Sequence, residues 1–191
     1  MPSRTHGSEE MMAKIACHHV GRVEQPRVLI GGLGMGYTLR AALDRLPPHA
    51  EVVCAELMEA IVEWHRGPLG PLANHPIEDP RVRVIVEDVT ELIKRREQKY
   101  DAILLDVDNG PIPMTVAGNW WLYAKEGLSE LFRSIGPGGM LIVWSAGEDE
   151  RFLERMQRVG FRAECVRVAA RTGRRKRRGR GYAHTLFIGR R

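Results

Sequence analysis

The stretch that decides the fold is VLIGGLGMG, residues 28–36, in which a short apolar run leads directly into closely spaced glycines. The apolar run predicts a buried strand, and the periodicity after residue 36 predicts a helix. Glycine permits a tight turn and a close approach of the backbone to a ligand, while the N-terminus of the next helix offers free N–H groups. The stretch therefore predicts a strand, loop and helix unit that binds a nucleoside or a phosphate.

The spacing of the glycines indicates which kind of nucleotide or nucleoside site is present. Gly32, Gly34 and Gly36 form a GxGxG pattern, and Tyr37 occupies the position where a dinucleotide GxGxxG motif needs its third glycine. This spacing disfavours an NAD enzyme and favours a methyltransferase-like nucleoside loop. The alternative is a glycine turn with only a structural role.

Outward from this unit, short apolar segments alternate with longer segments of helical period. The expected strands are 27–31, 51–56, 82–86, 100–106 and 140–145, and the expected helices are 37–46, 58–66, 89–98 and 123–135. Such alternation predicts a parallel sheet with crossover helices. The Gly-Pro-Gly-Gly segment at 136–139 is expected to break the chain before the fifth strand.

The C-terminal part of the chain has a different pattern. We expect a helix over 148–159 and then two strands, 162–169 and 182–188, that form an antiparallel hairpin with a basic loop at 170–181. The Pro/Gly-rich stretches 67–80 and 109–118 are expected to be loops that follow strands. The predicted fold class is α/β, Rossmann-like, in one domain over 1–191 with a helical lead-in at 1–26.

Acidic residues stand at the ends of the expected strands. Glu56 follows Gly32 by 24 residues and ends the second strand, where a carboxylate can accept both hydroxyls of a ribose. Asp88 follows the third strand and could accept from an adenine amino group, cap the next helix, or do both. With their neighbours Leu57 and Val89, these residues are candidates for cofactor binding.

The fourth strand ends in Asp106, and Asp108 and Asn109 come directly after it. Carboxylates at this place suit an amine substrate, because one can hold an ammonium group while the other accepts a proton as the amine becomes a nucleophile. The alternative is an acidic turn or a helix cap.

These segments resemble the spermidine synthase family, polyamine aminopropyltransferases built on the class I S-adenosylmethionine-dependent methyltransferase fold. The resemblance covers roughly residues 8–145, in order and spacing. It rests on the glycine loop at 28–43, Glu56, Glu87-Asp88, YDAILLD at 100–106 with Gly110-Pro111, Leu122-Tyr123, and GPGG at 136–139.

The resemblance implies an aminopropyl transfer from decarboxylated S-adenosylmethionine to a diamine or polyamine, with release of methylthioadenosine. Asp106 would be the catalytic residue, and Asp108, Asn109 and Tyr123 would lie on the acceptor side. The glycines, Glu56 and Asp88 would hold the donor. The resemblance also implies a homodimer, and no metal ion is expected.

The chain departs from this family at several places. Met35 stands where the family's glycine loop has an Asp, and Ser8-Glu9-Glu10-Met11 stands where the family has Tyr-His-Glu-Met. Because only 26 residues precede the first strand, the family's N-terminal β domain is expected to be absent. An alternative is therefore a methyltransferase that uses intact S-adenosylmethionine on a small amine or on RNA.

Composition limits the remaining classes of protein. The 191 residues are 43% hydrophobic and 28% charged, which suits an ordinary globular domain. Three widely spaced cysteines indicate neither a disulfide framework nor a metal site, and favour a reducing, cytoplasmic setting. The sequence contains no secretory signal pattern and no run of 18 apolar residues, so no membrane association is expected.

The net charge of +5 is unevenly distributed. Residues 171–191 contain nine Lys and Arg and no acidic residue, which leaves 20 basic against 24 acidic residues in the rest of the chain. The arginine-rich run at 174–180 could contact nucleic acid phosphates, and a nucleic-acid-binding module is the alternative from another class of protein. A solvated loop is the simpler interpretation, because aromatic residues hardly interrupt the run.

Overall fold

The computed structural model describes residues 6–95, 98–107, 110–111, 120–170 and 183–191. The helices are α1 (Gly7–Val20), α2 (Tyr37–Leu43), α3 (Glu59–His65), α4 (Val89–Arg95), α5 (Trp120–Tyr123), α6 (Lys125–Ser134) and α7 (Glu150–Val159), with 3₁₀ turns η1 (Gly70–Ala73) and η2 (Pro76–Glu78). The strands are β1 (Arg27–Gly31), β2 (Glu51–Glu56), β3 (Val82–Val86), β4 (Tyr100–Leu105), β5 (Ile135–Ser145), β6 (Arg162–Ala169) and β7 (Ala183–Arg190).

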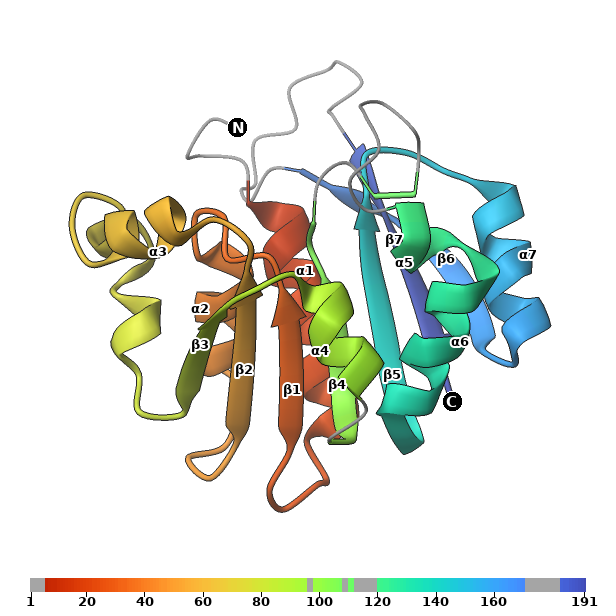
Figure 1. Cartoon of the computed structure of the whole chain (residues 1–191), viewed down its shortest axis with the longest axis horizontal. Coiled ribbons are helices and arrows are strands. Elements are labelled where there is room, and N and C mark those ends of the chain that lie inside the picture. The colour runs from red at the N-terminus through yellow and green to blue at the C-terminus, as the bar shows by residue number, and fades with distance from the viewer. Residues whose placement is uncertain (1–5, 96–97, 108–109, 112–119, 171–182) are drawn as a thin grey trace.

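These strands form one seven-stranded sheet of order β3-β2-β1-β4-β5-β7-β6 (Figure 1). The first five strands of this order are mutually parallel, whereas β7 is antiparallel to both β5 and β6. The predicted α/β class, with a mostly parallel sheet and a C-terminal antiparallel hairpin, is confirmed. The hairpin does not simply extend the edge, because its second strand inserts between the first strand and the parallel part.

Helices cover both faces of the sheet, and the central strands are buried on both sides. Along β1, Val28 and Ile30 pack with α1, α2 and α3, while Leu29 packs with the helices α4–α7 on the opposite face. β4 alternates in the same way, with Leu104 on one face and Ile103 on the other. This period of two explains why both strands appear as continuous apolar runs in the sequence.

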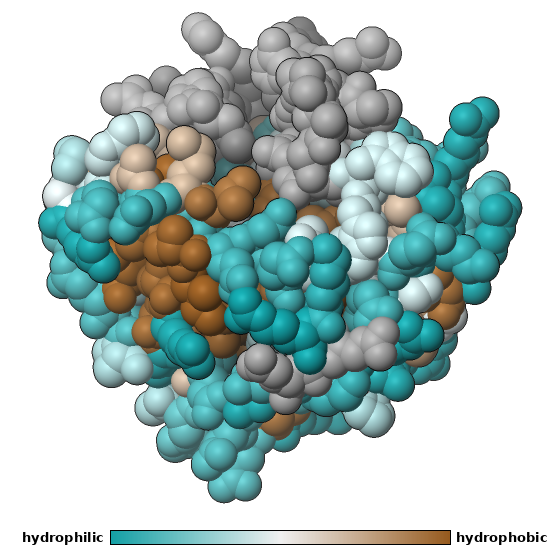
Figure 2. All heavy atoms as spheres, viewed as in Figure 1, coloured by the Kyte–Doolittle hydropathy of each residue, from teal (hydrophilic) through white to brown (hydrophobic). Residues whose placement is uncertain are grey.

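Figure 2 shows the face that carries α4 and α6, where polar side chains cover the helices and an apolar area lies over β2 and β3. Strand β3 is the sheet edge on this side, and its five residues are only partly buried or exposed.

Several predicted boundaries were wrong. Strand β5 begins at Ile135, so the Gly-Pro-Gly-Gly segment lies within the strand and does not precede it; an irregularity in the β4–β5 register between Tyr100 and Ala102 accommodates these residues. The expected helix over 123–135 corresponds to α6, which begins only at Lys125; Tyr123 ends the separate short helix α5, and Ala124 between the two helices is extended. The stretch 67–80 does not follow a strand as expected: it lies between helix α3 and strand β3.

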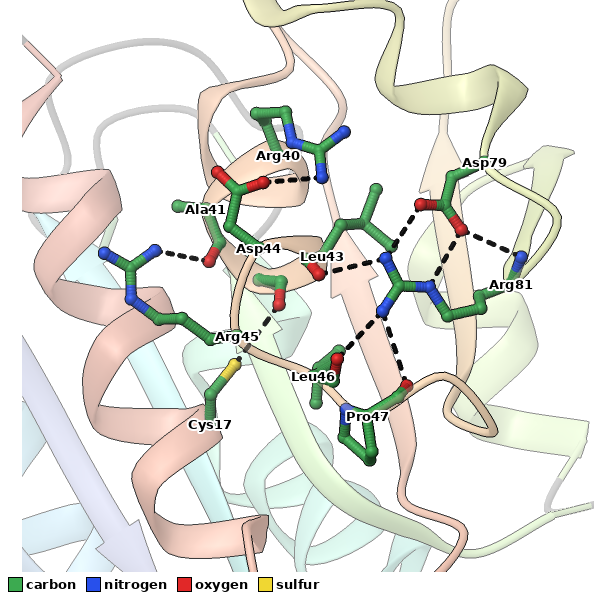
Figure 3. Close-up of polar contacts among 11 residues, drawn as sticks. Cys17, Arg40, Ala41, Leu43, Asp44, Arg45, Leu46, Pro47, Asp79 and Arg81 are labelled. Carbon is green, nitrogen blue, oxygen red and sulfur yellow. Dashed lines mark hydrogen bonds and ion pairs between the residues drawn. The ribbon is translucent and has the colours of Figure 1, made fainter.

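An arginine fastens the end of α2 to the segment before β3 (Figure 3). The Arg81 guanidinium donates to the carbonyl oxygens of Leu43 and Leu46 at 2.9 Å, and to the Asp79 carboxylate at 2.7 and 2.9 Å. These bonds satisfy carbonyl groups that a helix C-terminus leaves without intrahelical partners. Hydrogen bonding to Arg81 lowers the pKa of Asp79 to about 2.

Candidate active site

The strand order reverses direction between β1 and β4, which creates a crevice at their carboxyl ends. Backbone bonds connect the end of β1 to both neighbouring strands: the Asp106 N–H, after β4, donates to the Gly31 carbonyl at 2.9 Å, and the Gly32 N–H donates to the Ala55 carbonyl of β2 at 2.8 Å. Gly32 has a φ of +92°, and a Cβ there would lie 2.4 Å from the Asp106 carbonyl oxygen. Only glycine fits this crossing, which accounts for the first glycine of the motif.

A cavity of about 250 Å³ occupies this crevice. The glycine loop, the end of β2 with the start of α3, the end of β3 with the start of α4, and the end of β4 all contribute to it. Its lining residues are Gly32, Gly34, Ala55, Glu56, Leu57, Met58, Ile61, Glu87, Asp88, Val89, Asp106 and Val107. The structure thus brings together seven residues that the sequence singled out, from four separate strand ends.

Glu56 is buried and fastens the glycine loop. Its Oε2 accepts from the backbone N–H of Leu33 at 2.9 Å and of Gly34 at 3.4 Å, and its Oε1 accepts from the N–H of Met58 at 2.9 Å. The charged carboxylate is stabilised by these donors. Because a carboxylate has about four acceptor positions, these three bonds leave about one position, on Oε1, for a ligand hydroxyl.

Asp88 caps the start of helix α4, which is one of the two roles that the sequence predicted for it. Its Oδ1 accepts from the Thr90 N–H at 2.8 Å, at the start of α4. The neighbouring Glu87 forms an ion pair with Arg95, whereas Val89 is buried and lines the cavity. One oxygen of Asp88 is thus engaged at the helix start, and a cavity-lining role remains compatible with it.

Asp106 lies at the inner wall of the cavity. The Thr38 hydroxyl, in the first turn of α2, donates to its Oδ2 at 2.7 Å. Burial raises the pKa of Asp106 from 3.8 to about 6; the Thr38 hydrogen bond opposes this rise, and the negative charge of Glu9 adds to it. A carboxyl group with such a pKa can exchange a proton near neutral pH.

Glu9 belongs to a buried polar cluster that sequence reasoning did not assign to the site. Ser8 is fully buried at the start of α1, and its hydroxyl donates to Glu9 Oε2 at 2.5 Å. Trp144 Nε1 donates to the same hydroxyl oxygen at 3.1 Å, and His184 Nδ1 lies 2.8 Å from it. Since the single hydroxyl proton goes to Glu9, His184 must donate through a protonated Nδ1. The only sequence signal was the alignment of Ser8-Glu9-Glu10-Met11 with a family motif.

The remaining predicted site residues lie elsewhere. Gly36 caps α2 behind the loop and does not line the cavity described above; Tyr123 is buried on α5, and its hydroxyl donates to the Val107 carbonyl at 3.2 Å. Tyr123 thus supports the backbone immediately after Asp106. Asp108 and Asn109 lie outside the described residues, as does the arginine-rich run at 174–180.

Other chemistries find little support in the described ranges. Within them no group of three His, Cys, Asp or Glu side chains is arranged to hold a metal ion. Burial raises the pKa of Cys17 to about 11 and of Cys54 to about 12, so neither thiol forms a thiolate nucleophile near neutral pH. Among the same residues, no helix is long and apolar enough to cross a membrane.

Comparison with known sequences adds a family context to this geometry. The spermine/spermidine synthase domain pattern matches residues 5–168. The chain is 33% identical over 126 residues to the polyamine aminopropyltransferase of Korarchaeum cryptofilum, a match that covers 65% of this chain and 37% of that protein. It is 30% identical over 115 residues to the polyamine aminopropyltransferase of Saccharolobus solfataricus, covering 60% of this chain and 37% of that protein. The matches span little more than a third of these relatives.

Solved structures with the same fold include spermidine synthase from Thermotoga maritima, with a TM-score of 0.74 and 17% identity over 96% of this chain and 59% of that chain. Human methyltransferase-like protein 13 in complex with S-adenosylhomocysteine has a TM-score of 0.64 and 16% identity, over 95% of this chain and 78% of that chain. At these identities the likeness establishes the class I methyltransferase-like fold.

Proposed function

Because the chain belongs to the spermine/spermidine synthase domain family, we propose that it transfers an aminopropyl group from decarboxylated S-adenosylmethionine to the nitrogen of a small amine. The observation that carries this proposal is the charge of the cavity. Four carboxylates line it, those of Glu56, Glu87, Asp88 and Asp106, and no Lys or Arg among the described residues does. Glu87 is paired with Arg95, so the carboxylates of Glu56, Asp88 and Asp106 carry the charge that faces the cavity. Negative charge gathered in a crevice favours cationic ligands, and both a sulfonium donor and an ammonium acceptor are cations.

The cavity walls suit the two halves of an adenosyl donor. Leu57, Met58, Ile61 and Val89 offer apolar surface for the adenine ring. Glu56 would accept from a ribose hydroxyl, and Asp88 from the adenine amino group. In this proposal the glycine loop contributes close backbone approach at Gly32 and Gly34, whereas Gly36 shapes the loop from behind.

Asp106 would act on the acceptor. Its ionised carboxylate binds the ammonium form of the amine and takes up the proton that the nitrogen loses. The nitrogen lone pair then forms a bond to the donor methylene carbon while the carbon–sulfur bond breaks. The sulfur keeps that electron pair and becomes the neutral thioether of methylthioadenosine. Positioning of the two reactants supplies much of the acceleration in such a displacement, and Thr38 would fix the carboxylate for it.

The first test is calorimetric titration of the purified protein with decarboxylated S-adenosylmethionine, intact S-adenosylmethionine and methylthioadenosine in parallel. Aminopropyl transfer requires that the decarboxylated donor binds more tightly than the intact one. Preference for the intact donor would instead support the methyltransferase alternative, and binding of none would refute the proposed donor site. An Asp106→Asn variant that binds methylthioadenosine normally but transfers nothing would support the assigned role, whereas unchanged turnover would refute it.

A further inference from the structure

His65 contacts the glycine loop but does not line the cavity. It is the last residue of α3, it is fully buried, and its Nε2 lies 3.0 Å from the Gly34 carbonyl oxygen. The loop leaves room for this ring only because residue 36 is glycine: a Cβ on Gly36 would lie 2.8 Å from His65 Cε1. The imidazole therefore fills the space directly behind the loop.

The hydrogen-bond pattern defines which tautomer is present. A carbonyl oxygen only accepts, so the proton must be on Nε2, which donates to Gly34. His65 Nδ1 is buried and has no hydrogen-bond partner within the described residues. The polar contact of the His65 ring is therefore the bond from Nε2 to Gly34, a residue that lines the cavity.

The Gly34 residue is thus held at both of its polar backbone groups. Its N–H donates to Glu56 at a long distance of 3.4 Å, and its carbonyl accepts from His65 at 3.0 Å. Glu56 lines the cavity in which the proposed donor would bind, while His65 does not line it. The contact from His65 is consequently the one that a ligand in the cavity does not compete for.

We propose that His65 is a positioning residue that holds the glycine loop in the shape that binds the nucleoside of the donor. This inference rests on the proposed function, but it concerns the loop and not the transfer step. A single net hydrogen bond corresponds to a change of about threefold to tenfold in affinity. We therefore expect His65→Leu to bind methylthioadenosine about threefold to tenfold more weakly than the wild type.

Conservative replacement tests whether the Nε2 donor is responsible. The amide nitrogen of glutamine can reach the place of Nε2, whereas that of asparagine reaches only the place of Nδ1. His65→Gln should restore affinity to within about twofold of the wild type, and His65→Asn should not. His18→Leu, on the exposed side of α1, serves as a control and should leave affinity unchanged. In turnover assays, the loss in His65→Leu should appear in KM for the donor more than in kcat.

Hydrogen exchange separates this inference from the proposed function. The amides of Leu33 and Gly34 should exchange faster in His65→Leu than in the wild type, without any ligand present. If the wild type binds no adenosyl ligand, the proposed function fails and the exchange rates still decide the role of His65. Equal exchange rates in the two proteins would overturn the inference, as would affinity in His65→Gln as weak as in folded His65→Leu.

Discussion

Replacing Asp106 with asparagine should stabilise the ligand-free protein at neutral pH while it removes the proposed transfer activity. The wild-type carboxyl group has a pKa of about 6 in the folded protein, against an ordinary value of 3.8. Each pKa unit corresponds to about 1.4 kcal/mol, so ionisation of Asp106 costs the folded state at most about 3 kcal/mol above pH 6. Partial solvent contact reduces this value, and we expect a gain of about 1–3 kcal/mol in the variant.

The sign of the pH dependence follows from the same shift. A raised pKa means that the folded state binds the proton more tightly than the unfolded state, so protonation removes the cost in the wild type. The cost is fully present above pH 6, declines as the pH falls through about 6, and disappears below 3.8. Asparagine does not titrate, and it retains an oxygen that accepts from Thr38. The stability advantage of the variant should therefore shrink over this pH range.

Urea denaturation of both proteins at pH 8, 6 and 4 measures this difference directly. Asp79→Asn provides a control of opposite sign, because hydrogen bonding to Arg81 lowers the pKa of Asp79 to about 2. That variant should be less stable than the wild type at pH 8 by at most about 2.5 kcal/mol, and the difference should fade as the pH falls below 3.8 towards 2. The reasoning fails if Asp106→Asn gives no stabilisation at pH 8, or the same stabilisation at pH 4.

Four further substitutions test the site and the residues that support it. Glu9→Gln removes a negative charge that raises the pKa of Asp106, so the acid limb of the pH dependence of stability should move to lower pH; an unmoved limb would contradict the coupling. Glu56→Gln loses acceptor capacity for the loop amides, and calorimetry should show affinity for methylthioadenosine weakened about tenfold or more. Gly36→Ala forces a Cβ into the imidazole behind the loop at a φ of +80°, and should cost about 2–3 kcal/mol in urea denaturation. Gly34→Ala, which has open space at its Cβ, should cost less.

Some features of the site could be predicted from the sequence because they depend on short-range pattern. The alternation of strands and helices defined the parallel sheet, and parallel strands place their carboxyl ends at one edge. Glu56 ends a strand, and Asp106 and Asp88 follow their strands within two residues, so their convergence on one cavity follows from that pattern. The boundaries of β1, β2, β3 and β6 also matched the prediction, since apolar runs flanked by turn residues mark them clearly.

Other features required the tertiary structure, because they depend on residues far apart in the chain. Ser8 meets Trp144 and His184 across sequence separations of 136 and 176 residues, and no local periodicity encodes such contacts. The raised pKa of Asp106, after β4, results from burial and from Glu9 on helix α1, and the position of β7 between β5 and β6 results from pairing across the sheet.

For the glycine motif, the sequence determined the conformation of the backbone, and the tertiary structure determined its neighbours. The sequence determined that the backbone turns sharply after β1, because glycine readily adopts the positive φ values found at Gly32 and Gly36. Only the tertiary structure decided that Gly32 faces the cavity and the exit of β4, while Gly36 makes room for His65 behind the loop. The physical reason is that the φ values open to glycine are a property of the residue itself, whereas tertiary packing determines which group occupies the space that its missing side chain leaves.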